Sequence, residues 1–131
     1  MPETEIQTIL VIDDDWLNHE VLESILGYAG HKVLQAQRGN EGLKLAVTEL
    51  PDLILADVNL PDIDGFILCE SLKKNPKTQH IPIILISGHI QGQLQRQKAK
   101  TAGAFDFIER ILKPDDLLTY INAALASTSP N

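Results

Sequence analysis

The sequence is poor in cysteine, in basic charge and in long hydrophobic runs. Its single cysteine, Cys69, excludes an internal disulfide, and nothing in the sequence points to an oxidising compartment. The 18 acidic residues outnumber the 11 Lys and Arg, and the resulting net charge of −7 disfavours nucleic acid and anionic membranes as partners. No apolar run approaches the ~20 residues that span a bilayer, and no basic-then-apolar leader opens the chain. We therefore expect a cytoplasmic protein that binds neither nucleic acid nor membrane.

The sequence does contain enough apolar side chain for one hydrophobic core. Hydrophobic residues make up 44% and charged residues 22% of the 131 positions, which is typical of a globular protein. A chain of this length forms one domain. We expect the domain to span residues 6–126, between flexible polar termini at residues 1–5 and 127–131.

Short apolar segments alternate with segments of helical periodicity, five of each. We expect strands near residues 8–12, 32–36, 53–56, 81–86 and 104–108, and helices around residues 21–26, 43–50, 65–74, 91–102 and 115–125. Asp15 and Asn40 are the expected caps of the first two helices. Because the strands are almost continuously apolar, they indicate a parallel sheet covered on both faces. The predicted fold class is α/β, an open doubly wound sheet of five strands in the order 2-1-3-4-5.

Acidic residues follow two strands that are neighbours in this order. Asp13 and Asp14 come directly after the first strand, and Asp57 ends the third. The carboxyl ends of parallel strands share one edge of the sheet, so these three carboxylates should converge there. Such close negative charges repel one another unless a cation is present, and oxygen ligands of this kind suit Mg²⁺. The plainer interpretation, in which an aspartate merely caps the next helix, is the one we prefer for Asp15 alone.

Three motifs, each at the end of a predicted strand, together carry a family resemblance. They are Ile9–Asp15 (ILVIDDD), Asp57–Gly65 (DVNLPDIDG) and Ile83–Ser87 (IILIS). In this order and spacing they strongly resemble the receiver domain of two-component response regulators. The resemblance covers residues 9–126, almost the whole chain.

The resemblance implies a role for each acidic residue. Asp57 corresponds to the phosphoacceptor, which takes a phosphoryl group from a histidine kinase or a phosphotransfer protein. Asp14 and Asp57 would bind Mg²⁺ directly, Asp13 through a water molecule, and the backbone carbonyl of Asn59 would complete the protein ligands. The implied protein phosphorylates itself and dephosphorylates itself, and is not a turnover enzyme.

The resemblance also implies which residues would transmit phosphorylation of the site to the protein surface. Ser87 would bind a phosphoryl oxygen and, with the aromatic Phe107, would act as a switch that alters contacts with a downstream protein. Asn59 and His89 occupy the positions at which family members tune dephosphorylation.

The end of the fifth predicted strand departs from the family pattern, which has a lysine followed by proline. Aligned without gaps from Gly103, these two positions are Arg110 and Ile111, whereas Lys113-Pro114 fits only if three residues are inserted. Proline in the first turn of a helix explains Pro114 without any catalytic role. We therefore expect Arg110 to contact the phosphoryl group, with Lys113 as the alternative. A planar arginine is not equivalent to lysine at a tight site.

Other functions remain to be distinguished from that of a phosphoacceptor. The altered fifth strand favours a pseudo-receiver, which would serve as a constitutive protein-interaction module. A dehalogenase-type phosphatase would also use an aspartyl nucleophile, but it requires a second aspartate where this chain has Asn59. A flavin-binding protein would need a phosphate-binding loop after the first strand, and none is present.

The remaining polar residues give no further motif. The four histidines have no metal-ligand spacing, and we expect them to be solvated: His19, His31, His80 and His89. Cys69 is expected to be a small residue in or beside the core.

Overall fold

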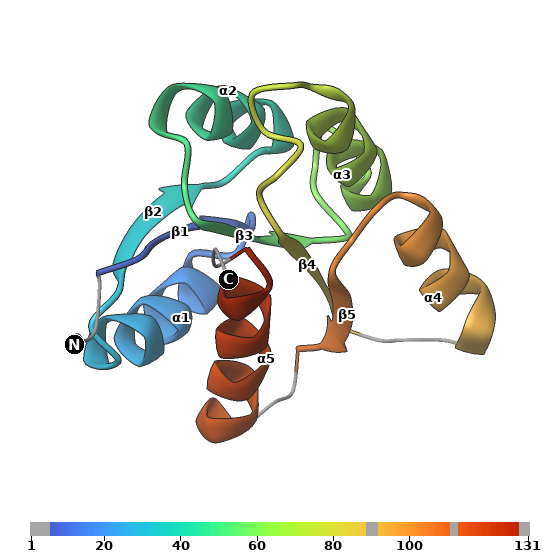
Figure 1. Cartoon of the computed structure of the whole chain (residues 1–131). Coiled ribbons are helices and arrows are strands. Elements are labelled where there is room, and N and C mark those ends of the chain that lie inside the picture. The colour runs from blue at the N-terminus through green and yellow to red at the C-terminus, as the bar shows by residue number, and fades with distance from the viewer. Residues whose placement is uncertain (1–5, 89–91, 111–112, 129–131) are drawn as a thin grey trace.

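The computed structural model, which describes residues 6–88, 92–110 and 113–128, has one parallel sheet with helices on both faces (Figure 1). The strands are β1 (Thr8–Ile12), β2 (Lys32–Ala36), β3 (Leu53–Asp57), β4 (Ile83–Ser87) and β5 (Asp106–Glu109). The helices are α1 (Trp16–Tyr28), α2 (Gly39–Glu49), α3 (Gly65–Lys74), α4 (Gly92–Thr101) and α5 (Pro114–Ser127). The strand order is β2-β1-β3-β4-β5 and every neighbouring pair is parallel, which confirms the predicted fold.

The sheet separates two hydrophobic cores because successive strand residues point to opposite faces. Leu10 and Ile12 of β1 belong to the core under α2, α3 and α4, whereas Ile9 and Val11 belong to the core under α1 and α5. Figure 1 shows α2 and α3 on one side of the sheet and α1 and α5 on the other. Burial on both faces explains why the strands are almost continuously apolar.

Two strands begin later than their apolar runs predict. β4 begins at Ile83 because Pro82 has no N–H to donate, and the N–H of Ile81 instead closes a turn on Thr78. β5 begins at Asp106 because the N–H of Ala104 is bonded to the carbonyl of Ala99, at the end of α4.

The helix ends confirm one predicted cap and overturn another. The side chain of Asp15 accepts a hydrogen bond from the N–H of Leu17 and caps α1 as expected. Asn40 does not cap α2, because the helix begins at Gly39 and its terminal N–H groups are bonded by another side chain, that of Asp62. α5 continues through Ser127, so the first residue of the expected flexible tail is helical. None of the helices, as far as the structure describes them, is long and apolar enough to span a bilayer.

Candidate functional site

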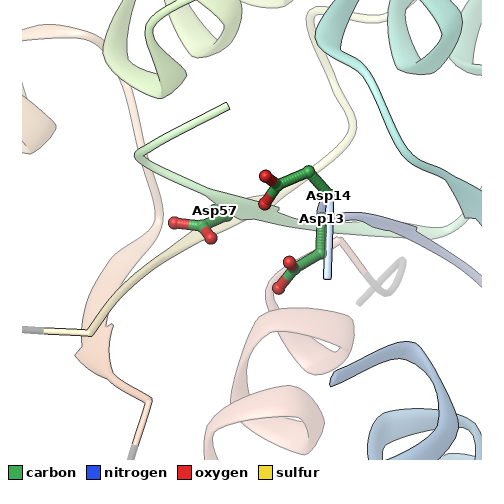
Figure 2. Close-up of side chains that lie close together, drawn as sticks. All are labelled: Asp13, Asp14 and Asp57. Carbon is green, nitrogen blue, oxygen red and sulfur yellow. The ribbon is translucent and has the colours of Figure 1, made fainter. Parts of the chain in front are cut away.

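Three carboxylates gather at the carboxyl ends of β1 and β3 (Figure 2). One oxygen each of Asp13, Asp14 and Asp57 lies within 4.8 Å of the others. Asp13 and Asp57 are buried, with only 2% and 8% of their surface exposed, whereas Asp14 is exposed. β1 pairs directly with β3, so the convergence follows from the strand order, as the sequence predicts.

Both oxygens of Asp57 have partners. Oδ1 accepts a hydrogen bond of 2.9 Å from the N–H of Asn59, and Oδ2 accepts one of 2.6 Å from Nη2 of Arg110. Burial raises the pKa of Asp57, against the N–H of Asn59 and the charge of Arg110, which lower it, while Asp13 and Asp14 raise it further. A cation bound here would favour the ionised carboxylate, which is the nucleophilic form.

Asp13 is held by its own loop and by the same arginine. Its Oδ1 accepts a hydrogen bond of 2.9 Å from the N–H of Asp15, and the amide of Asn18 lies 3.3 Å from Oδ2. Nη1 of Arg110 donates to Oδ2 at 2.8 Å. Asp13 is therefore fixed in orientation, whereas the neighbouring Asp14 faces solvent.

The arginine reaches the site from the end of β5. Glu109 pairs in register with Ser87, and the N–H of Arg110 then donates to the carbonyl oxygen of Ser87 at 2.9 Å. The side chain of Arg110, 25% exposed, forms salt bridges to both buried carboxylates. Lys113 is exposed and occupies the N-cap of α5. Of the two candidate cations, the structure brings Arg110 to the carboxylates, while Ile111 lies outside the described residues.

The two expected switch residues are both buried. Ser87, at the end of β4, is 3% exposed. Phe107, on β5, is 5% exposed, and its ring meets that of Phe66 edge to face with centroids 5.9 Å apart. Phe107 thus points into the core beneath α3 and α4, and His89 lies outside the described residues.

The loop after β3 passes very close to its own strand. A Cβ atom at Gly65 would lie 2.6 Å from the backbone oxygen of Asp57 and 2.6 Å from Cα of Val58. The side chain of Asp64 accepts a hydrogen bond of 2.7 Å from the N–H of Phe66 and caps α3. Only glycine allows this close approach, which sets the loop beside Asp57.

The same loop is tied to α2 by Asp62. Its two carboxylate oxygens accept hydrogen bonds from the N–H groups of Gly39 and Asn40, at 2.8 and 2.9 Å. The N–H of Asn40 is the main cause that holds the pKa of Asp62 below its ordinary value. A carboxylate at a helix N-terminus also meets the positive end of the helix dipole. Asp62 therefore fixes the β3–α3 loop from outside the acidic cluster.

Comparison with known proteins places this arrangement in a family. The model of the response regulator receiver domain matches residues 9–122. The chain belongs to the receiver domain family of response regulators. This membership confirms the resemblance, and it sets aside the phosphatase and flavin-binding alternatives.

Some relatives match this chain over almost their whole length, whereas others are much longer than it. The chain is 35% identical to protein PilH of Pseudomonas aeruginosa, over 90% of this chain and 97% of PilH. A crystal structure of a putative response regulator from Chloroflexus aurantiacus is 34% identical, with a TM-score of 0.86 over 93% of this chain and 99% of that one. Other curated relatives are longer, and the chain spans only 24% to 49% of their length.

Receiver domains bind Mg²⁺ at an acidic site, and one solved relative illustrates this. The receiver domain of the sensor histidine kinase PA1611 from Pseudomonas aeruginosa was crystallised with a magnesium ion coordinated in its active site cleft. It is 25% identical, with a TM-score of 0.84 over 93% of this chain and 99% of that one. In the present receiver the clustered donors are carboxylate oxygens, and burial raises the pKa of Asp57. Three carboxylates face one arginine here, and hard oxygen donors with such an excess of negative charge fit a small divalent cation.

His19 is a contributor to the receiver site that the sequence interpretation missed. The expectation that it is solvated was wrong, because it is 3% exposed and its Nε2 lies 2.6 Å from the carbonyl oxygen of Asp13. A signal was present, since His19, Leu22 and Leu26 share helical spacing and all three are buried on α1. Cys69 is buried in the core, as expected.

Proposed function

We propose that residues 6–126 form a phosphoacceptor receiver that takes a phosphoryl group onto Asp57 and thereby changes its contacts with other proteins. The observation that carries the proposal is the environment of Asp57. Its carboxylate lies at the end of β3, within 4.8 Å of oxygens of Asp13 and Asp14 and in a salt bridge with Arg110. A nucleophile, a place for a divalent cation and a fixed cation thus meet at one point.

In the proposed reaction, a carboxylate oxygen of Asp57 attacks the phosphorus of a phosphohistidine. The new oxygen–phosphorus bond forms as the phosphorus–nitrogen bond breaks, and the histidine nitrogen leaves with the electron pair. Asp14, Asp57 and the Asn59 carbonyl would hold Mg²⁺ directly, and Asp13 would do so through water. When bound, the metal neutralises charge on the transferring group and aligns it.

The protein's own residues then orient the product. The N–H of Asn59 keeps the Asp57 carboxylate in position before transfer. Arg110 provides charge-assisted hydrogen bonds for the phosphoryl oxygens, and Ser87 contacts one of them. Movement of Ser87 and repacking of Phe107 would carry the change to the surface, and later attack by water would reset the switch.

The proposed partners are proteins. The phosphoryl donor is a histidine kinase or phosphotransfer protein, and the output is a downstream protein target. A net charge of −7 makes nucleic acid and anionic membranes unfavourable partners for this receiver itself. The cytoplasm is the proposed location, a compartment that suits the free thiol of Cys69.

Acetyl phosphate and Mg²⁺ test the proposal on the intact chain. We expect intact-mass spectrometry to show one phosphoryl adduct on the wild type and none on Asp57→Asn, which keeps the shape but removes the nucleophile. An adduct that persists on Asp57→Asn, or no adduct on the wild type, would contradict the assignment.

A second candidate function is that of a pseudo-receiver acting as a constitutive interaction module. The double salt bridge of Arg110 favours it, because this pairing stabilises Asp13 and Asp57 without any phosphoryl group. This candidate predicts no adduct, and unchanged binding to its target when Asp57→Asn is introduced.

A further inference from the structure

One guanidinium group bridges two of the three clustered carboxylates. Nη1 of Arg110 lies 2.8 Å from Oδ2 of Asp13, and Nη2 lies 2.6 Å from Oδ2 of Asp57. These two contacts are charge-assisted because a guanidinium donates to carboxylates. Both carboxylates are buried, so solvent screens the contacts poorly. Arg110 therefore already supplies a positive charge between the carboxylates.

The bridge also uses the oxygens that the backbone leaves available. Oδ1 of Asp13 is held by the N–H of Asp15, and Oδ1 of Asp57 by the N–H of Asn59. Arg110 takes the Oδ2 atom of each. Every oxygen of the two buried carboxylates thus has a hydrogen-bond partner inside the protein.

The shape of arginine makes this possible. Its planar guanidinium presents donors in a rigid fork that can hold two carboxylates at once, whereas lysine is a point charge on a flexible stem. Mg²⁺ needs near-octahedral oxygen ligands at short distance and gives up its water reluctantly. A metal ion that binds these carboxylates must therefore compete with the guanidinium of Arg110 for the same oxygens and the same negative charge.

We propose that Arg110 is a built-in counter-cation, which competes with Mg²⁺ for Asp13 and Asp57 and so sets the metal affinity of the site. The inference rests on the proposed function for the identity of the metal site. Its consequence is that this receiver responds only at a higher Mg²⁺ concentration than it would with a non-bridging side chain at position 110.

Direct titration with MgCl₂ tests the competition on the full chain. The variants are Arg110→Gln, which removes the charge, and Arg110→Lys, which keeps the charge but cannot span both carboxylates. Lys113→Gln is the matched control, because it removes one exposed positive charge close along the chain. Calorimetry gives Kd, and the fluorescence of Trp16 gives a second readout, since it is the single tryptophan and begins α1 directly after the acidic residues.

We expect Arg110→Gln to lower the Kd for Mg²⁺ by about tenfold or more, because the metal ion is then no longer repelled by a positive charge a few ångströms away. Arg110→Lys should lower it by a smaller factor, and Lys113→Gln should stay within about twofold of wild type because its charge is screened. In EDTA, Arg110→Gln should melt below the wild type, since the carboxylates then repel one another. Saturating Mg²⁺ should reduce this difference in melting temperature between Arg110→Gln and the wild type.

An unchanged or higher Kd for Arg110→Gln would overturn the proposal. So would an Arg110→Lys variant that binds Mg²⁺ like the wild type, because the bridge would then not be what competes. The acetyl phosphate assay separates this result from the proposed function. If Arg110→Gln binds Mg²⁺ more tightly but no variant forms an adduct, the competition is supported and phosphoacceptance is refuted. If adducts form but the Mg²⁺ affinities are unchanged, phosphoacceptance is supported and the competition is refuted.

Discussion

Nε2 of His19 donates a hydrogen bond of 2.6 Å to the carbonyl oxygen of Asp13. A carbonyl can only accept, so Nε2 carries a proton, while Nδ1 is buried with no hydrogen-bond partner among the residues that the structure describes. The contact joins the buried face of α1 to the loop after β1. It therefore fixes the backbone that carries one of the clustered carboxylates.

Replacing His19 should reveal this contact in the stability of the protein. His19→Leu leaves the buried carbonyl of Asp13 without a donor, and we expect a loss of about 1–3 kcal/mol in the free energy of unfolding. His19→Gln can place an amide donor near the Nε2 position and should lose less. Urea denaturation measures both, and equal losses would show that packing rather than the hydrogen bond matters.

Asp62 should make stability depend on pH in a defined direction. Its pKa in the folded protein is held below the ordinary 3.8, so the ionised side chain stabilises the fold fully above that value. The stabilisation is lost as the pH falls through the lower folded pKa. We expect the wild type to have a higher urea midpoint than Asp62→Asn at neutral pH, with the difference disappearing in acid. A difference that is as large in acid as at neutral pH would contradict this origin.

Gly65 should not tolerate a side chain. Because its Cβ would meet two backbone atoms at 2.6 Å, Gly65→Ala must shift the loop beside Asp57. We expect a loss of about 1–3 kcal/mol in stability and slower adduct formation with acetyl phosphate. Gly27→Ala is the control, since a Cβ there meets nothing within 4 Å and alanine favours the helix by up to about 1 kcal/mol. Similar behaviour of the two variants would argue against a steric role for Gly65.

Cys69 should be chemically silent in the folded protein. Burial raises the pKa of its thiol from 9.0 to about 11, which lowers the reactive thiolate fraction about a hundredfold. Its Sγ also lies 3.4 Å from the carbonyl oxygen of Ala102. We expect a thiol reagent at pH 8 to modify the native chain at least about a hundredfold more slowly than the chain in urea. Comparable rates in both conditions would contradict the buried placement.

The convergence of Asp13, Asp14 and Asp57 could be predicted from sequence because it depends only on strand order. Continuous apolar runs indicate buried parallel strands, and the rules for connecting them leave few orders. Side chains at strand ends then share one edge whatever the details of packing. The position of Arg110 at that edge follows in the same way from counting along β5.

The partners of individual polar groups could not be predicted in this way. Asn40 has the chemistry of a helix cap, but the N–H groups of α2 are bonded by Asp62, 22 residues away in sequence from Asn40. The two-carboxylate bridge of Arg110 likewise depends on side-chain geometry across the sheet. Periodicity reports which face a residue occupies, and it carries no information about such distant contacts.

The bridge from Arg110 to Asp13 spans 97 residues of sequence, and the one to Asp57 spans 53. Contacts between residues this far apart in sequence form late in folding. Closing such long loops costs entropy, and the pairing of the strands between them must first offset that cost. A chain still emerging from the ribosome holds Asp13 and Asp57 well before it holds Arg110. The acidic edge of the nascent sheet therefore acquires its internal counter-charge only after β5 has been synthesised.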